Sequence, residues 1–262
     1  MSGLTLDRSE FLVLMDAVKA PVVVGLDTQT LVPADKEQHK ALVLAGLEKL
    51  KQRGLLRVEG DVHVLDPGLL AVAMAVGRPD VVVITRKDTP GLGSQLFLHY
   101  VAGPAIVEHT LPNEQEHRLA ALPDRPTLIE RLAAIMPAPD SQARPDERGV
   151  LSQDAFVAVK RQAENGAVAA AKAALAQGGL TPAGAESLAQ ALAHPVFGGT
   201  IALLAIEGSE ATDARNLALV QGQDAAWLIK QTTPGAPEFE VHTTDGLGLR
   251  TVLVRWLQEL EA

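Results

Sequence analysis

Seven histidines, spread over the whole chain, are the residues that could bind a metal ion. No two of them have the His-Glu-x-x-His spacing that puts two ligands on one face of a helix. His99 and His109 lie in neighbouring segments of alternating apolar residues, so they could be cross-strand neighbours with Glu108 or Glu114 close by. A surface metal site at this place is one hypothesis. The pattern favours a simpler interpretation, in which these histidines are solvent-facing positions on strands.

Phosphate-binding loops and serine nucleophiles are the next candidates. Residues 91–94 read Gly-Leu-Gly-Ser, but a phosphate loop needs a helix N-terminus after it, and a strand-like segment follows here. We therefore expect a hairpin loop at 90–93 and a turn at 245–248 that leads into the last helix. The chain has no Gly-x-Ser-x-Gly motif. The serines without a recognisable nucleophile context are Ser94, Ser152, Ser187 and Ser209.

Paired carboxylates could act as a general acid and a general base. Glu114 with Glu116 and Asp146 with Glu147 fall in predicted loops or in the linker, where solvated charge is the ordinary explanation. The absence of cysteine excludes disulfides, thiolate metal ligands and cysteine nucleophiles. The sequence therefore predicts no catalytic, cofactor-binding or metal-binding residues, no cofactor and no enzymatic activity.

Composition narrows the class of protein further. The chain has 262 residues, of which 47% are apolar, and this is typical of a globular protein with one large domain or two ordinary ones. Its 23 basic and 32 acidic residues give a net charge of −9, which opposes binding to nucleic acid. The N-terminus does not resemble a signal peptide, and no apolar run approaches the roughly 18 residues of a membrane span. We expect a cytoplasmic protein that contacts no membrane.

The elements that would position these side chains follow a pattern that occurs twice. Residues 4–14 contain an extended apolar segment, a capping residue and an apolar helix, and residues 150–159 repeat this plan. Asp7 with Glu10 three positions later predicts a capping box. Ser152 lacks the matching acid, so it would cap its helix alone.

Two further helices are predicted in each half. A long helix is expected at 33–53, with a counterpart that ends at Gln177, and a glycine follows each where a left-handed residue suits the helix end. Asp-Pro at 66–67 and Thr-Pro at 181–182 then open short helices, because Pro is favoured in the first turn. The first half alone inserts a hairpin, at 56–64.

Each half then takes the alternating pattern of strands and closes on an amphipathic helix. Three strands in succession without intervening helices predict an antiparallel meander, and a weaker fourth strand is expected after each. The predicted strands are 80–86, 95–101, 105–110 and 117–120 in the first half and 200–206, 216–221, 226–231 and 238–242 in the second, and the closing helices are 128–136 and 249–260.

These patterns predict an α+β fold that is internally duplicated about a pseudo-twofold axis. A lone meander has two exposed edges, so we expect the two antiparallel meanders to join in a central sheet with flanking helical bundles. The first repeat is 1–136, a Pro-rich charged linker is 137–148 and the second repeat is 149–262, together forming one joined domain. The alternative is two separate domains connected by the linker.

One segment is similar to a winged helix-turn-helix. Residues 44–65 contain the end of a helix, a Gly-Leu step and a hairpin. Its basic residues are Lys49, Lys51, Arg53 and Arg57. The acidic balance of the whole chain opposes DNA binding by this segment.

The assembled pattern resembles the EspG family, the cytosolic chaperones of type VII (ESX) secretion. The resemblance is carried by the Leu-rich opening into a helix with Phe11, the helix ending at 50–55, the Asp-Pro helix at 66–67 followed by Pro79, and the strands after it. It implies a quasi-twofold fold with a central antiparallel sheet between helical bundles. The chain departs from the family at 12–15, where members carry a Trp, and no binding residues of the family transfer to it.

Three functions follow, in order of preference. The first is a non-catalytic protein-binding module, of the kind of an EspG-like chaperone that would hold a small helical secretion substrate. The alternative is an enzyme or small-molecule binder with a pocket between the two repeats. The third is a winged-helix-like regulator. The expected partner is another protein, with a homodimer as a further arrangement, and the partner-binding residues are unknown from the sequence.

Overall fold

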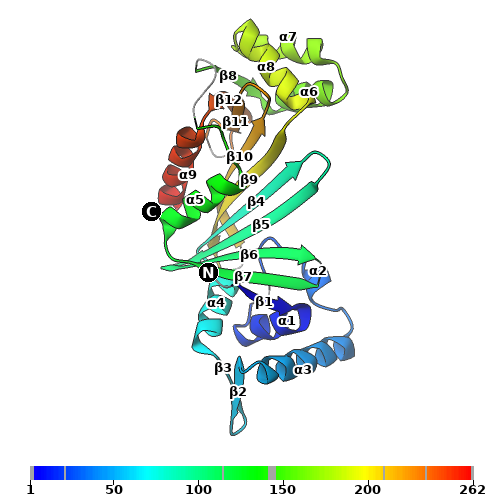
Figure 1. Cartoon of the computed structure of the whole chain (residues 1–262), viewed down its shortest axis with the longest axis vertical. Helices are drawn as coiled ribbons and strands as arrows, with labels where there is room; N and C mark the ends of the chain where they lie inside the picture. Colours follow the sequence, from blue (N-terminus) through cyan, green and yellow to red (C-terminus); the bar gives the residue numbers. More distant parts are fainter. Residues whose placement is uncertain are drawn as a thin grey trace. The chain divides into compact units, whose positions relative to one another are not determined.

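The computed structural model describes residues 3–20, 22–113, 115–140, 146–208, 210–233 and 235–260 (Figure 1). The elements of the first half are β1 (Leu4–Asp7), α1 (Arg8–Ala17), α2 (Thr28–Leu31), α3 (Lys36–Gln52), β2 (Leu56–Glu59), β3 (Val62–Leu65), α4 (Pro67–Gly77), β4 (Val81–Thr89), β5 (Gly93–Ala102), β6 (Ala105–Asn113), β7 (Glu116–Leu122) and α5 (Arg125–Ile135). The elements of the second half are β8 (Arg148–Ser152), α6 (Gln153–Glu164), α7 (Val168–Gln177), α8 (Pro182–Ala193), β9 (Phe197–Glu207), β10 (Glu210–Gln221), β11 (Ala226–Gln231), β12 (Glu238–Thr244) and α9 (Gly246–Leu260).

The strands of both halves belong to one ten-stranded sheet, in the order β1-β7-β6-β5-β4-β9-β10-β11-β12-β8, and β2 and β3 form a separate hairpin. Neighbouring strands of this sheet pair in the antiparallel direction, for example β5 with β6, β11 with β12 and β12 with β8. The predicted α+β class and the joining of two meanders are confirmed. The internal duplication, the twofold relation and the boundaries at 136 and 148 stay predictions, and linker residues 141–145 lie outside the described part of the chain.

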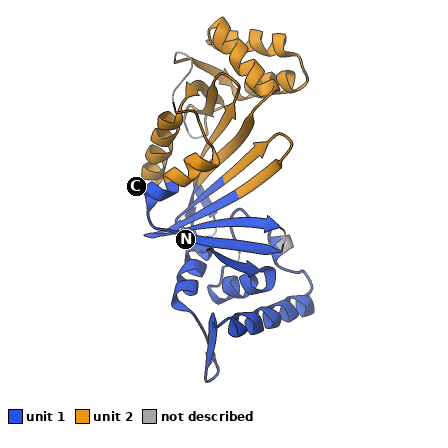
Figure 2. Ribbon diagram, viewed as in Figure 1, with its two compact units in different colours: residues 1–84, 97–128, 204–212 blue, residues 85–96, 129–203, 213–262 orange. Residues whose placement is uncertain are grey.

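Contacts between residues divide the chain into two compact units (Figure 2). Unit 1 contains Met1–Ile84, Phe97–Leu128 and Leu204–Thr212, and unit 2 contains Thr85–Leu96, Ile129–Leu203 and Asp213–Ala262. Among the described residues, no helix is both long and apolar enough to span a bilayer.

The predicted helix caps are confirmed. Asp7 accepts hydrogen bonds from the backbone N–H of Ser9 and of Glu10, and the Glu10 carboxylate accepts one from the Asp7 N–H at 2.9 Å, which completes the capping box. Ser152 caps α6 alone, through the Ala155 N–H at 3.2 Å. Asp66 and Thr181 cap α4 and α8 in the same way, each with Pro at the first helical positions.

Some predicted boundaries are wrong. The long helix begins at Lys36 rather than at residue 33, because the Asp35 carboxylate caps it through the Gln38 N–H. The turn expected at 245–248 is instead the first turn of α9, since Asp245 accepts a hydrogen bond from the Gly248 N–H at 2.8 Å. The hairpin loop at 90–93 is confirmed, because β4 ends at Thr89 and β5 begins at Gly93.

The core of unit 1 is built around α1, which packs against α3, α4 and β7. Phe11 and Leu14 of α1 are fully buried, and so is Leu50 of α3. The two helices meet at Gly46, where an added Cβ would lie 2.2 Å from the Ser9 carbonyl oxygen. Only a residue without a side chain allows α1 and α3 to come this close.

The core of unit 2 lies where α6, α7 and α8 pack against one another and α6 packs on β8 and β12. Trp227 of β11 is the largest fully buried side chain there, and it contacts a cluster that includes Val159, Leu175 and Leu188. Burying one such side chain contributes about 1.5–3 kcal/mol. This core holds α6 and α8 in place, and both helices contribute to the groove described next.

Candidate partner-binding groove

Unit 2 contains an open hollow of about 490 Å³, which we name the hairpin groove. It lies between the β4–β5 hairpin, the C-terminal part of α6, the end of α8 and the strands β9 and β10. Its lining residues are Asp88, Thr89, Pro90, Gly91, Gly93, Ser94, Lys160, Glu164, Leu192, Pro195, Gly198, Gly199, Thr200, Ala218 and Val220. Six elements from three separate stretches of the sequence, β4–β5, α6 and α8–β10, therefore contribute to one surface feature.

The tip of the β4–β5 hairpin carries Leu92, whose side chain is 82% exposed. It is flanked by Gly91 and Gly93, which have φ angles of +78° and +81° and no other atoms within 4 Å of an added Cβ. Two glycines in the left-handed region turn the chain tightly, so the apolar residue between them projects into solvent. Val196 and Val157 are also exposed; Val196 directly follows the lining residue Pro195, and Val157 lies three positions before Lys160 on α6.

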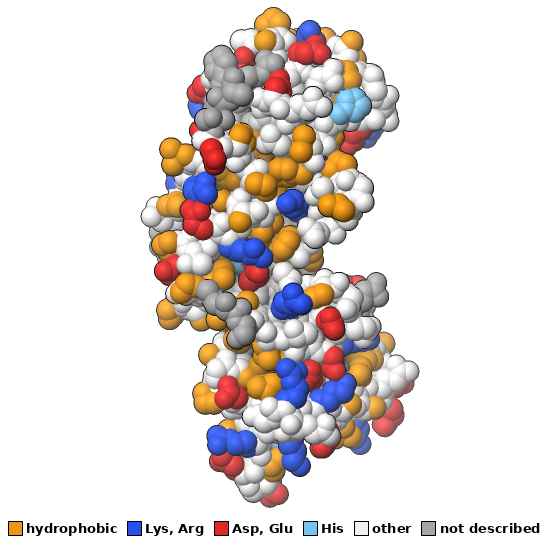
Figure 3. Space-filling model, viewed as in Figure 1, with side chains coloured by type: hydrophobic (Ala, Val, Ile, Leu, Met, Phe, Trp, Pro, Cys, Tyr) orange, Lys and Arg blue, Asp and Glu red, His pale blue; other side chains and the backbone are white. Residues whose placement is uncertain are grey.

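The floor of the groove is apolar and its charged groups pair with one another. Lys160 and Glu164 form an ion pair at 2.5 Å on one face of α6. Arg86 pairs with Asp88 at 3.3 Å and donates a hydrogen bond to Ser94 Oγ at 2.9 Å. Figure 3 shows hydrophobic side chains gathered between such charged groups over unit 2. An apolar floor with a polar rim is typical of protein-binding surfaces.

The prediction that His99 and His109 face solvent is wrong. Both are 0% exposed, because they lie in the middle of a sheet that is covered on both faces. They are not cross-strand neighbours either, since His99 lies opposite Glu108 and His109 lies opposite Leu98. His99 Nε2 is 3.0 Å from Glu108 Oε2.

His109 instead contacts His117 of β7, with Nε2 of the first 3.0 Å from Nδ1 of the second. The ring of Phe11 stacks on His117, with 4.1 Å between the ring centroids. Burial, together with the neighbouring His117, lowers the pKa of His109 to about 3. Burial also lowers the pKa of His117 to about 4, although Asp7 acts in the opposite direction. Both rings are therefore neutral at physiological pH and belong to the core of unit 1.

The hypothetical metal site has no support among the described residues, in which no three His, Asp or Glu side chains are grouped to hold an ion. Glu114 lies outside the described part of the chain. Its proposed partner Glu116 accepts a hydrogen bond from the Asn113 amide at 3.0 Å, within the turn between β6 and β7.

Glu147 is not the solvated charge that its place in the linker predicts. It is buried, and it accepts hydrogen bonds from the Thr181 hydroxyl at 2.5 Å and from the Thr181 N–H at 3.2 Å. An added Cβ at Gly184 would lie 2.5 Å from this carboxylate. A negative charge is stabilised at the start of a helix, so Glu147 anchors the N-terminus of α8.

The serines have structural roles where the structure describes them. Ser187 is buried, donates a hydrogen bond to Asp224 at 2.9 Å and accepts one from the Trp227 indole at 3.4 Å. Ser152 is the cap of α6, and Ser94 accepts a hydrogen bond from an arginine. Ser209 lies outside the described residues.

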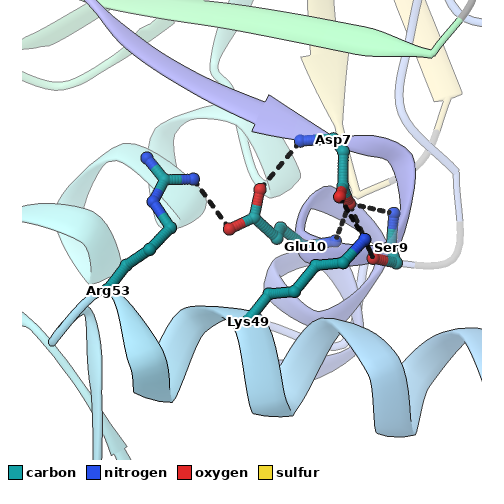
Figure 4. A network of polar contacts seen from close by, with 5 residues as sticks. All are labelled: Asp7, Ser9, Glu10, Lys49 and Arg53. Carbon is teal, nitrogen blue, oxygen red and sulfur yellow. Dashed lines mark hydrogen bonds and ion pairs between the residues drawn. The ribbon is translucent and has the colours of Figure 1, made fainter.

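Two basic residues of the winged-helix-like segment point back to the start of α1 (Figure 4). Lys49 binds the Asp7 carboxylate at 2.5 Å, and Arg53 binds the Glu10 carboxylate at 2.7 Å. Burial alone would raise the pKa of Asp7, but hydrogen bonds from Lys49, Ser9 and the backbone of Glu10 outweigh it and lower the pKa to about 2. These two cations therefore hold α3 against the α1 cap. Of the four basic residues that would support DNA binding by this segment, only Lys51 and Arg57 remain.

Replacing Arg53 by Met is expected to lower the free energy of unfolding by about 2 kcal/mol, between the values for exposed and buried ion pairs. The reason is that the Glu10 side chain is only 5% exposed and would lose its ionic partner. Urea unfolding measures the effect, with the exposed Lys51→Met as the matched control. If Arg53→Met and Lys51→Met are equally stable, the ion pair is not what holds the two helices together.

The comparisons with known proteins bear on the fold. No family model matches the chain, and no curated protein matches its sequence. Among solved structures, it is similar to the Mycobacterium tuberculosis type VII secretion system chaperone EspG5, solved in complex with a PE25–PPE41 dimer. The TM-score is 0.68, the alignment covers 96% of each chain, and 14% of residues are identical. The resemblance to EspG proteins noted in the sequence is thus confirmed for the fold: over almost its entire length, the chain has the fold of a type VII secretion chaperone.

Proposed function

We propose that the chain is a non-catalytic, chaperone-like protein of the cytoplasm that binds a helical protein partner through the hairpin groove. The observation that carries this proposal is Leu92, a large apolar side chain held in solvent at the hairpin tip, between the lining residues Gly91 and Gly93 of an apolar groove. An exposed apolar residue is ordinary by itself, but beside a groove with an apolar floor it is typical of a binding site. The likeness to EspG5, a chaperone in complex with a protein dimer, supports the same class of function.

A helical segment is the partner that suits this groove. An amphipathic helix places its apolar face on an apolar floor and its polar face at the rim, beside the ion pairs Lys160–Glu164 and Arg86–Asp88. The partner we propose is therefore a small helical protein or a pair of them, such as a secretion substrate kept in soluble form. The binding energy would come mainly from burying the hairpin tip and the half-buried floor residue Val220.

Replacing Leu92 by Glu is expected to weaken partner binding at least about tenfold, because a carboxylate placed against the apolar face of the partner would lose its hydration without gaining an ionic partner. The partner is first isolated from a lysate of the source organism with the tagged wild-type chain, then purified and titrated against each variant by calorimetry. Val62→Glu on the β2–β3 hairpin is the matched control, because it also replaces an exposed apolar residue at a hairpin tip, in unit 1.

The Leu92 and Val62 side chains are largely exposed, so both variants should fold like the wild type, which thermal unfolding checks. A helical partner that binds the wild type and Val62→Glu, but binds Leu92→Glu far more weakly, supports the proposal. Equal binding to all three proteins would show that the partner binds at a surface other than the hairpin groove. A catalytic turnover by the purified chain would overturn the non-catalytic assignment.

A further inference from the structure

A second hollow of unit 2, separate from the hairpin groove, has a volume of about 280 Å³. It lies between β10, the end of β11 and the last two turns of α9. Its lining residues are Ala214, Arg215, Asn216, Lys230, Gln231, Thr232, Thr233, Arg255, Trp256 and Glu259. Three of them are basic and one is acidic, although the chain as a whole carries a net charge of −9.

Arg215 is the unusual residue of this pocket. Its side chain is only 15% exposed, and its terminal nitrogen lies 3.1 Å from Asp213 and 3.8 Å from Glu259. Its Nε is buried and has no hydrogen-bond partner. Because Nε is closed off from solvent, an anion in the pocket would bind Arg215 through its terminal nitrogens, which already contact two carboxylates.

Glu259 marks where an anionic group can lie. Its two carboxylate oxygens are 3.8 Å from Arg215 and 3.6 Å from Arg255, so it bridges two guanidinium groups at distances longer than good hydrogen bonds. It belongs to the last turn of α9 and is half exposed, so it can move aside. Lys230 forms a close ion pair with Glu240, so its charge is already compensated.

We propose that this pocket binds a small phosphate-bearing molecule, held between Arg215 and Arg255 in the place that the Glu259 carboxylate occupies. A phosphate has more acceptor oxygens than a carboxylate, and Asn216, Thr232 and Thr233 add amide and hydroxyl groups around it. The guanidinium is the side chain best suited to bind phosphate in two-point contact. The site is independent of the protein-binding function proposed above.

The test uses inorganic phosphate and phenyl phosphate as probes, titrated by calorimetry at constant ionic strength with chloride as the balancing anion. Arg255→Gln should weaken binding about tenfold, the equivalent of one charge-assisted hydrogen bond. Glu259→Gln should instead tighten binding several-fold, because it removes the group that competes for the same arginines. Arg250→Gln is the matched control, because Arg250 is on the same helix but binds Glu130 outside the pocket.

The opposite signs of the two variants distinguish a ligand site from a structural role. Saturable binding that Glu259→Gln tightens, Arg255→Gln weakens and Arg250→Gln leaves unchanged supports the proposal. Absence of saturable binding overturns it and leaves a pocket filled by water only. Weakening by Glu259→Gln, or equal weakening by Arg250→Gln and Arg255→Gln, overturns it as well. Inorganic phosphate binding as tightly as phenyl phosphate would assign the site to the free ion, and tighter binding of phenyl phosphate would assign it to a phosphate ester.

Discussion

Lowering the pH from 7.5 to 5.0 is expected to lower the free energy of unfolding by about 3 kcal/mol, because His109 and His117 are buried as neutral rings. In the folded chain their pKa values are lowered from 6.5 to about 3 and about 4. In the unfolded chain both rings would bind a proton near pH 6.5. The unfolded state therefore binds more protons than the folded state at pH 5, and stability falls as the pH falls.

The pH window separates this effect from that of the carboxylates. The loss begins as the pH falls below about 6.5 and continues until the folded pKa values near 4 and 3 are reached. Asp7 acts in a lower range, since its pKa is lowered from 3.8 to about 2 and its contribution to stability is lost only as the pH falls toward 2. At pH 5 the loss therefore comes from buried histidines: the pair His109 and His117, together with His242, whose pKa is also lowered by burial.

The measurement is urea unfolding at the two pH values. A double variant with His109→Leu and His117→Leu removes both polar partners together, so no buried group is left without its hydrogen bond. Its stability should change much less between pH 7.5 and 5.0, whatever its absolute value. The control His63→Leu removes an exposed histidine of β3 and should keep the wild-type pH dependence. A wild-type protein equally stable at both pH values would contradict the burial of the neutral pair.

Replacing Gly46 by Ala is expected to destabilise unit 1 by about 2 kcal/mol. The added methyl group would lie 2.2 Å from the Ser9 carbonyl oxygen and 2.8 Å from Val13 Cγ2. The nearest atom belongs to the backbone, so no rotation of a side chain relieves the clash and α1 and α3 must move apart. Overpacking a core commonly costs 1–3 kcal/mol, which exceeds the gain of up to about 1 kcal/mol from replacing Gly by Ala in a helix.

The matched control for this substitution is Gly68→Ala in the first turn of α4. A Cβ at that position would meet only Asp66 Oδ1, at 3.1 Å, and this side-chain oxygen can shift by a few tenths of an ångström, whereas the backbone oxygen beside Gly46 cannot. Urea unfolding should therefore give a stability close to or above that of the wild type for Gly68→Ala. Gly46→Ala at wild-type stability would show that the two helices do not depend on their close approach.

Local signals in the sequence predicted much of the fold. Asp7 with Glu10 predicted a capping box, and Gly54 predicted a left-handed residue, observed at a φ of +70°. Helix caps and helix ends depend on residues within a few positions of one another, so a short stretch of sequence contains every group that determines them. The strand pattern also predicted every strand of the two meanders, and the fourth strands β7 and β12 are full members of the sheet.

Long-range contacts explain what the sequence did not show. The strand alternation suggested one solvent-facing side, but the sheet in unit 1 is covered on both, so His99 and His109 are buried. Glu147 binds Thr181, 34 positions away, and nothing near it in the sequence signals this partner. The hairpin groove combines residues from 88 to 220, so it could not be recognised before the strands were placed.

The pairing of β1 has a consequence for synthesis of the chain. β1 leaves the ribosome well before its partner β7, with which it pairs through Leu4 opposite Leu119. At translation rates of about 5–20 residues per second, β1 must wait roughly 6–23 seconds before β7 has been made. During this interval α1 follows an unpaired strand, and its apolar residues Phe11 to Met15 have no finished core to enter. The nascent chain is therefore most exposed to aggregation and to general chaperones while the first half is being translated.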